Sequence, residues 1–311
     1  MNFPFNAIRD AEFDVVTFGT NAVDYLIQVP EYPAFNSKVE LVDYVQAAGG
    51  EAATTAVGLQ RLGLKTAYAG RFGTDQAGDF GIQSLKIEGV NITFAEQIPG
   101  ARTQIAFIIV DDASGERTVI WQRDAKLAFS ASDAPAAIAK QTKVLHFTPH
   151  DVAACLQMAM AGREHKTLVS SDIDNVFVGL TELLPMIDIM IASAEFPKKL
   201  LGIDDRKTAL LELKSRFGCG IVGVTLGEAG SLLLCGDTFI ETAGFAVPGG
   251  CRDTTGAGDA FRVGLLYGLL RGESVEESAR IANAVAALKC RQVGARTALP
   301  DESELREFLK S

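Results

Sequence analysis

The sequence holds few of the residues that build disulfide frameworks, zinc sites or membrane spans. Its 5 cysteines are odd in number, scattered and never spaced as CxxC, which argues against a disulfide scaffold and a zinc knuckle. No apolar stretch reaches membrane-spanning length without a charge. The opening residues, MNFPFNAIRDAEFDVV, lack a basic segment followed by an apolar run, so we expect a cytoplasmic protein.

Basic residues are also in deficit. Lys and Arg number 29 against 39 Asp and Glu, which gives a net charge of −10. Such a surface repels phosphate backbones and anionic lipid headgroups, so we expect no nucleic-acid partner and no membrane partner. Small anions remain possible ligands, because local backbone dipoles can hold them.

The chain does have ample apolar content, with 48% hydrophobic residues among 311. Short runs rich in β-branched residues alternate with segments of helical period, which predicts an α/β fold with a doubly wound, mostly parallel sheet flanked by helices. The expected strands are Phe13–Gly19, Thr66–Gly70, Lys143–Phe147, Thr167–Asp172, Asp188–Ile191 and Ile221–Leu226. The expected helices are Glu51–Leu62, Gln76–Glu88, Val152–Glu164, Phe177–Leu184, Asp205–Phe217, Gly256–Arg271, Val275–Arg291 and Glu302–Leu309.

Two stretches, Asp24–Gln46 and Arg102–Arg123, break this rhythm because apolar and polar residues alternate in them. The alternation predicts antiparallel strands with one solvent-exposed face. Since the two stretches are interleaved with core elements, we expect one domain over residues 1–311 with a discontinuous β lid formed by about 24–48 and 100–124. The exposed lid strands also favour a homodimer in which two lids cover each other's edges.

The segment Asp253-Thr-Thr-Gly-Ala-Gly-Asp259 precedes a run of helical period, so a helix is expected to begin among its glycines. Backbone N–H groups at a helix start have no intrahelical partner, and small residues let an anion approach them. Asp259 would lie in the first turn, where its carboxylate could accept a proton from a hydroxyl. The alternative is a cap by Asp253 or Thr254, with Asp259 only complementing the helix dipole. No G-x-G-x-x-G opens a helix after the first strand, which disfavours dinucleotide binding.

At these residues the sequence resembles the ribokinase-like (PfkB) carbohydrate kinases. The segment from Asp253 to Asp259 matches the family's C-terminal signature, and Gly49-Gly-Glu-Ala-Ala-Thr-Thr-Ala-Val-Gly-Leu-Gln-Arg-Leu-Gly63 matches its N-terminal one. Gly70-Arg-Phe-Gly-Thr-Asp75 and Thr225-Leu-Gly-Glu-Ala-Gly230 follow in the expected order. The resemblance runs from about Val15 to Pro300 and implies the ribokinase-like fold.

The resemblance implies a kinase that transfers the γ-phosphate of ATP to a primary hydroxyl of a sugar or sugar-like molecule. Asp259 would be the general base that takes the hydroxyl proton, and Gly256, Ala257 and Gly258 would form the anion hole.

The resemblance also implies where the two substrates bind. For the sugar, Asp24 matches a carboxylate that hydrogen-bonds hydroxyls, a turn residue being the alternative, and Gly49 and Gly50 would let the backbone approach. For the nucleotide, the matching loop residues are Thr225, Gly227 and Gly230, with a plain β-turn as the alternative. The apolar helix that carries Asn283 would pack near the adenine.

Two positions depart from the family pattern. Thr54 stands where the family has a substrate-binding Asn, which implies a different sugar geometry or a weaker contact. Ser193 stands at the Asn of an Asn-x-x-Glu segment, and Glu195 falls one position from its Glu. Mg²⁺ would still be needed to shield the charge of ATP. A monovalent cation such as K⁺ is carried over near Asp253, Thr255 and the loop 291–297.

Other polar residues allow two interpretations each. Arg123 resembles a family position near the sugar, and a solvated lid charge is the equal alternative. Asp172 and Asp174 follow a predicted strand and would hold hydrated magnesium or substrate, or form a solvated loop. We expect His146 and His150 to be residues at the end of a strand.

The resulting expectation is an ATP-dependent sugar kinase. Glu51 disfavours a phosphosugar, because a carboxylate repels phosphate. The stretches 145–174 and 193–196 look more like ketohexokinase-type relatives, so fructose or a related ketose ranks first and ribose second. A nucleoside kinase of the same fold and an inactive sugar- or nucleotide-sensing protein are the alternatives, ahead of a NAD-dependent dehydrogenase.

Overall fold

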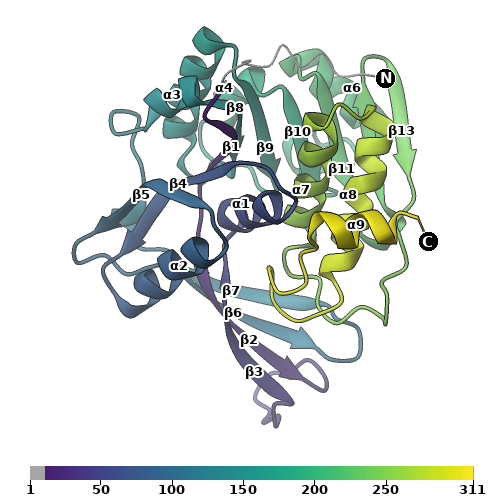
Figure 1. Ribbon diagram of the computed structural model, residues 1–311. Coiled ribbons are helices and arrows are strands. Elements are labelled where there is room, and N and C mark those ends of the chain that lie inside the picture. The colour runs from purple at the N-terminus through teal and green to yellow at the C-terminus, as the bar shows by residue number, and fades with distance from the viewer. Residues whose placement is uncertain (1–10, 311) are drawn as a thin grey trace.

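The computed structural model describes residues 11–310 and centres on one large sheet (Figure 1). Its strands are β1 (Phe13–Phe18), β4 (Thr66–Gly73), β5 (Asn91–Ile98), β8 (Thr142–Phe147), β9 (Leu168–Ile173), β10 (Ile189–Ser193), β11 (Ile221–Thr225), β12 (Ser231–Cys235) and β13 (Thr238–Thr242). They lie in the order β13-β12-β11-β10-β9-β8-β1-β4-β5. All neighbours from β5 to β11 are parallel, and β12 and β13 are antiparallel additions at one edge.

Helices cover both faces of this sheet and bury it in two apolar cores. One core is formed with α1 (Glu51–Arg61), α2 (Gln76–Ile87), α7 (Ala257–Leu270), α8 (Val275–Lys289) and α9 (Glu302–Phe308). The other is formed with α3 (Val152–His165), α4 (Leu180–Leu183), α5 (Phe196–Leu201) and α6 (Arg206–Phe217). Successive strand residues contribute to opposite cores, which explains the continuous apolar runs in the sequence.

A second, smaller sheet extends below the body of the molecule in Figure 1. It is formed by the stretches for which a lid was predicted, and we keep that name for it. Its strands are β2 (Ala22–Val29), β3 (Asp43–Gly49), β6 (Ile105–Asp111) and β7 (Arg117–Gln122), in the order β3-β2-β6-β7. The outer pairs are antiparallel, as predicted, but β2 and β6 run parallel. Strands β1 and β5 end at the same edge of the large sheet, so β2 and β6 both leave that edge in the same direction.

The predicted fold class is confirmed, and all six predicted core strands are present. The sequence analysis missed β5, β12, β13 and α5, which are edge elements or are only five or six residues long. The predicted helix 177–184 is reduced to the four residues of α4, followed by a short 3₁₀ turn. Within residues 11–310, no helix combines the length and apolar character that a membrane span requires.

Candidate active site

The strand order reverses at β1, because the chain proceeds to β4 on one side and later returns to β8 on the other. Ligands of open α/β sheets bind at the carboxyl ends of the strands beside such a reversal. The segment Gly19–Asn21 follows β1, and Thr148–Asp151 follows β8 at the same edge. Thr20 N donates to Thr148 Oγ1 over 3.2 Å, so the two segments lie side by side.

Helix α7 begins at this edge, as the sequence predicted. Gly256 is its N-cap residue, with a φ of 76°, and a Cβ there would lie 2.9 Å from the Cβ of Ala295. A Cβ on Gly258 would lie 2.6 Å from Arg262 Nη1. Small residues are therefore required, and the N–H groups of the first turn, which includes Ala257, form a positive end that suits an anion.

Asp259 lies in this first turn and is only 8% exposed. Its carboxyl is hydrogen-bonded to that of Asp172, which lies near the end of β9. Burial, the neighbouring Asp172 and Glu51 all raise the pKa of Asp259 well above its ordinary value. Two carboxyl groups in contact hold one proton between them more easily than they hold two negative charges.

Arg262, one turn further along α7, supplies the positive charge of this cluster. Its Nη2 lies 2.5 Å from Asp172 Oδ1 and donates to Ile191 O over 3.0 Å. The residue is 4% exposed, and its Nε has no hydrogen-bond partner among the described residues. The guanidinium lowers the pKa of Asp259 and so partly offsets the effect of burial.

Glu51 and His150 form a second charged pair beside this cluster. His150 Nε2 lies 3.3 Å from Glu51 Oε2, which also accepts a hydrogen bond from Thr20 Oγ1 over 3.3 Å. Burial opposes the ionisation of both groups, but each charge stabilises the other, so the pKa of Glu51 is lowered and that of His150 is raised. His150 follows β8 as predicted, yet its ion pair was not foreseen.

The imidazole of His150 also lies between two aromatic rings. Its centroid is 4.9 Å from the ring of Phe177 and 6.0 Å from that of Trp121, which comes from the lid strand β7. His146 is different, because it is fully buried in β8 with Nδ1 3.1 Å from Ser170 Oγ. Burial lowers the pKa of His146 to about 3.

On the lid side, the predicted sugar-binding residues lie together. Asp24 is within β2 and is 4% exposed, and a Cβ on Gly49 would come within 1.9 Å of its Oδ2. Gly50 is the N-cap residue of α1, with a φ of 87°, and a Cβ there would lie 2.3 Å from Asn21 Cα. Burial raises the pKa of Asp24 to about 6, although Arg296 pulls it down.

Arg296 is a site residue that the sequence analysis did not single out. Its Nε donates to Thr54 Oγ1 over 3.2 Å, and its Nη2 donates to the carbonyl of Gly49. Thr54 is fully buried in α1, so its hydroxyl holds Arg296 and any effect on a substrate would pass through the guanidinium. The only sequence signal was the place of Arg296 in the loop 291–297.

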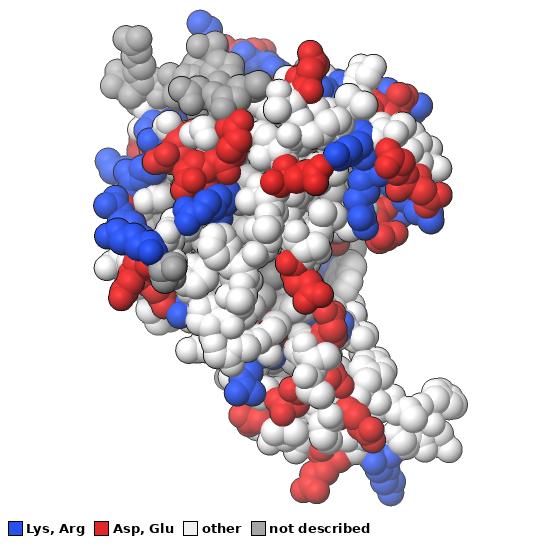
Figure 2. All heavy atoms as spheres, turned by 90° about the vertical axis from the view of Figure 1, so that its right-hand side faces the viewer, with Lys and Arg blue, Asp and Glu red and all other residues white. Residues whose placement is uncertain are grey.

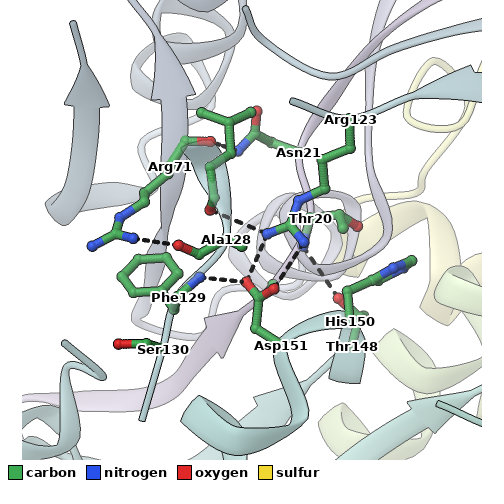
Figure 3. A network of polar contacts seen from close by, with 12 residues as sticks. Thr20, Asn21, Arg71, Arg123, Ala128, Phe129, Ser130, Thr148, His150 and Asp151 are labelled. Atoms are coloured by element: carbon green, nitrogen blue, oxygen red, sulfur yellow. Dashed lines mark hydrogen bonds and ion pairs between the residues drawn. The ribbon is translucent and has the colours of Figure 1, made fainter. Parts of the chain in front are cut away.

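Arg123 lies at the root of the lid, where it pairs with Asp151 (Figure 3). Its two terminal nitrogens lie 2.8 and 2.6 Å from the two oxygens of Asp151. Asp151 Oδ2 also accepts from Phe129 N over 3.1 Å. Arg123 is therefore not a freely solvated charge in this arrangement, because it joins the end of β7 to the segment after β8.

The predicted nucleotide-binding residues lie next to a cavity at the far end of the same edge, although none of them is among the residues that line it. Thr225 ends β11, and the turn from Gly227 to Gly230 leads into β12. Gly230 has a φ of 95°, and a Cβ there would lie 2.0 Å from Thr242 O. The cavity of about 690 Å³ is lined by Asp204, Asp205, Arg206, Lys207, Leu226, Ala229, Ser231, Leu232, Glu241, Thr242 and Ala243. Asn283 of α8 donates to Ser231 Oγ over 3.0 Å at this cavity.

The residues predicted to hold cations lie in two places. Glu195 is exposed just before α5 and lines a smaller cavity of about 170 Å³ with Lys198 and Arg206. Asp253 is fully buried, and its Oδ1 and Oδ2 accept from the backbone N of Thr255 and of Gly294, both over 2.8 Å. Across the described residues, no three His, Cys, Asp or Glu side chains converge to form an all-protein metal cage.

Comparisons with known proteins identify a family and relatives whose fold matches the one described above. The pfkB family carbohydrate kinase profile matches residues 13–302. Among curated relatives, the chain is 29% identical to fructokinase-1 of Zea mays, covering 95% of this chain and 97% of that one. It is 25% identical to a nucleoside kinase of Methanothermobacter thermautotrophicus, covering 94% of each chain. The structure of Arabidopsis thaliana ribokinase complexed with ribose and ATP superimposes with a TM-score of 0.83 at 24% identity, covering 96% and 99% of the two chains.

The match extends over nearly the whole described chain, and both signatures lie at the carboxyl edge of the sheet. The chain therefore belongs to the pfkB family of carbohydrate kinases and is a phosphotransferase that acts on a sugar or a nucleoside.

Proposed function

We propose that the protein transfers the γ-phosphate of ATP to a primary hydroxyl of a small sugar, with Asp259 as the general base. The observation that carries the proposal is the position of Asp259 at the positive end of α7, beside the small residues 256–258. A carboxylate there can accept the hydroxyl proton, while the N–H groups of the first turn stabilise the charge on the transferred phosphoryl group.

Arg262 and Asp172 set the protonation state of this base. Asp172 raises the pKa of Asp259, and the guanidinium of Arg262 works in the opposite direction. A base with a raised pKa holds the abstracted proton more firmly, provided that it is ionised when the substrate binds. Arg262 contacts Asp172 directly and so favours the ionised form of that carboxyl, while the same positive charge also lowers the pKa of Asp259.

Magnesium fits this edge of the sheet through its oxygen donors. Mg²⁺ keeps several waters and is bound by one or two carboxylates together with substrate phosphates, so an all-protein cage is not needed. Asp174 and Glu195 are the carboxylates that would hold the hydrated ion, which shields the charge of the ATP phosphates when bound. For ATP itself, the cavity beside Thr225, Gly230 and Asn283 is the proposed site.

An unphosphorylated ketose such as fructose ranks first as the acceptor, and ribose second. Asp24 is placed to hydrogen-bond sugar hydroxyls, while the Glu51 carboxylate beside Asp259 would repel a phosphosugar. The fructokinase relatives support this order. One observation favours a nucleoside as the alternative: Trp121, His150 and Phe177 form an aromatic cluster, and a planar base could stack against one of its rings.

The lid is proposed to close over the sugar and exclude water, and to pair with a second lid. Large apolar side chains are exposed on its edge strands, with Tyr44 at 68% and Ile120 at 56%. The lid projects from the body in Figure 2, where uncharged atoms lie between its acidic residues. Two such sheets would cover each other's open edges in a homodimer.

The acceptor is identified by measuring ADP release from ATP and Mg²⁺ across ketoses, aldohexoses, pentoses, sugar acids, phosphosugars and nucleosides. We expect the highest kcat/KM with a ketohexose. A higher value with a nucleoside would establish the alternative acceptor, and retained ATP binding without turnover on any compound would favour the sensing protein.

Replacing Asp259 by Asn should lower kcat on the best acceptor by about 10²- to 10⁴-fold, because the general base is lost. ATP affinity, measured by calorimetry, should stay within about threefold, since Asp259 is not placed at the adenine end. Asp237→Asn, at a fully exposed turn, is the matched control and should behave as the parent. A near-parental kcat for Asp259→Asn would remove this residue from the mechanism.

The acid limb of the pH profile should depend on Asp172. The reaction needs ionised Asp259, so kcat/KM should fall as the pH drops below its raised pKa. Asp172→Asn removes the neighbouring negative charge, lowers the pKa of Asp259 and should move the acid limb to lower pH. An acid limb that stays in place, or moves to higher pH, would contradict the coupling between the two carboxyls.

The lid interface is tested by the charge substitution Tyr44→Glu on β3. We expect the parent to sediment as a dimer at micromolar concentration and the variant as a monomer, because two carboxylates would meet at the interface. Glu307→Gln on the exposed face of α9 is the control and should remain dimeric. A monomeric parent would refute the lid-mediated homodimer.

A further inference from the structure

Lys289 is a lysine with no exposed surface, and it ends helix α8 directly behind the anion-binding turn. Its Nζ donates to the carbonyl oxygen of Asp253 over 2.7 Å and lies 3.8 Å from Asp253 Oδ2. Both side chains are 0% exposed. Burying an ammonium costs folding free energy unless oxygen atoms surround it. The position of Lys289 therefore depends on its contacts with Asp253.

The contact between Lys289 and Asp253 lies where the turn before α7 meets the loop that carries Arg296. Asp253 opens the turn that leads to Gly256 and the start of α7. Its Oδ2 accepts from Gly294 N, in the loop that also carries Arg296 and through it the carbonyl of Gly49. The Lys289 charge therefore neutralises a carboxylate that links the start of α7 to the loop carrying Arg296.

The resemblance described above places a monovalent cation near Asp253, Thr255 and the loop 291–297. The residues present do not fit such an ion well. The Asp253 carbonyl already receives the ammonium of Lys289, and each carboxylate oxygen of Asp253 receives a backbone N–H. Thr255 Oγ1 is buried without a hydrogen-bond partner, so an alkali ion would have to take the rest of its oxygen shell from backbone carbonyls, and Lys289 already occupies that of Asp253.

We propose that Lys289 is a built-in monovalent cation, whose ammonium fixes the turn 253–258 in its anion-binding conformation and makes phosphoryl transfer independent of added potassium. An ammonium carries the same single charge as a potassium ion and donates up to three hydrogen bonds to oxygen atoms. It is also tethered, so its occupancy does not vary with the salt. The inference rests on the proposed function in one respect, because it assumes that the turn 253–258 binds the transferred phosphoryl group.

The first test compares the parent protein in potassium chloride and in tetramethylammonium chloride at equal ionic strength. A specific ion site stabilises the folded state in proportion to its occupancy, so thermal melting reports binding without any substrate. We expect melting temperatures within about 1 °C of each other and kcat/KM values within about twofold. A melting temperature that rises with potassium and saturates, or a tenfold activation by potassium, would overturn the proposal.

Two substitutions test whether the charge itself is needed. Lys289→Ala removes the ammonium and leaves a space, whereas Lys289→Met removes the charge and keeps the chain volume. Both should lower kcat by about 10- to 100-fold, with a smaller change in the KM for ATP, because a residue behind the site orients the groups that stabilise the transition state. Potassium or ammonium ions should restore part of the activity of Lys289→Ala and raise its melting temperature, but should do neither for Lys289→Met.

Parental kcat in Lys289→Met would overturn the role of the charge, and so would equal rescue of both variants. If the variants do not fold, the salt comparison on the parent still decides the proposal. If the parent phosphorylates nothing in any salt, the proposed function fails, while the melting comparison tests the built-in cation separately.

Discussion

The ion pair between Arg262 and Asp172 is the contact on which the centre of the molecule depends. It joins the first turns of α7 to the end of β9, and the same guanidinium holds the end of β10 through the carbonyl of Ile191. Without this positive charge, the carboxylates around Asp259 would repel one another in a site with little water. The cluster therefore fixes α7 against the sheet and sets the charge of Asp259.

The wider site repeats this solution with other buried cations. Arg296 faces Asp24, His150 faces Glu51 and Lys289 faces Asp253. Each pair brings together segments that are far apart in sequence, and each neutralises a carboxylate locally while the net charge of the chain stays at −10. Charges that cannot be solvated must be paired, so these contacts tie the lid, the sheet and the C-terminal helices into one arrangement.

The sequence was sufficient for the parts that depend on local pattern. Strands such as β8 and β11 are buried on both faces and read as continuous apolar runs, while the glycines before Asp259 marked the start of α7. The burial of Arg296 and Lys289 could not be predicted from local pattern, because arginine and lysine side chains normally lie in solvent. Their partners are 36 to 247 residues away along the chain, so only the folded structure reveals them. The parallel pairing of β2 with β6 was missed for the same reason, since alternation does not encode strand direction.

Two of the four roots by which the chain joins the lid to the body are attached in different ways. The root after β1 is anchored inside the body, where Asn21 Nδ2 donates to the Tyr68 hydroxyl over 2.6 Å and to Arg71 O over 3.0 Å. The root after β7 carries the Arg123–Asp151 ion pair, whose side chains are 17% and 7% exposed (Figure 3). The other two roots run from β3 into α1 and from β5 into β6. Because the chain crosses between the body and this sheet four times, the position of the sheet depends on several connections and not on one hinge.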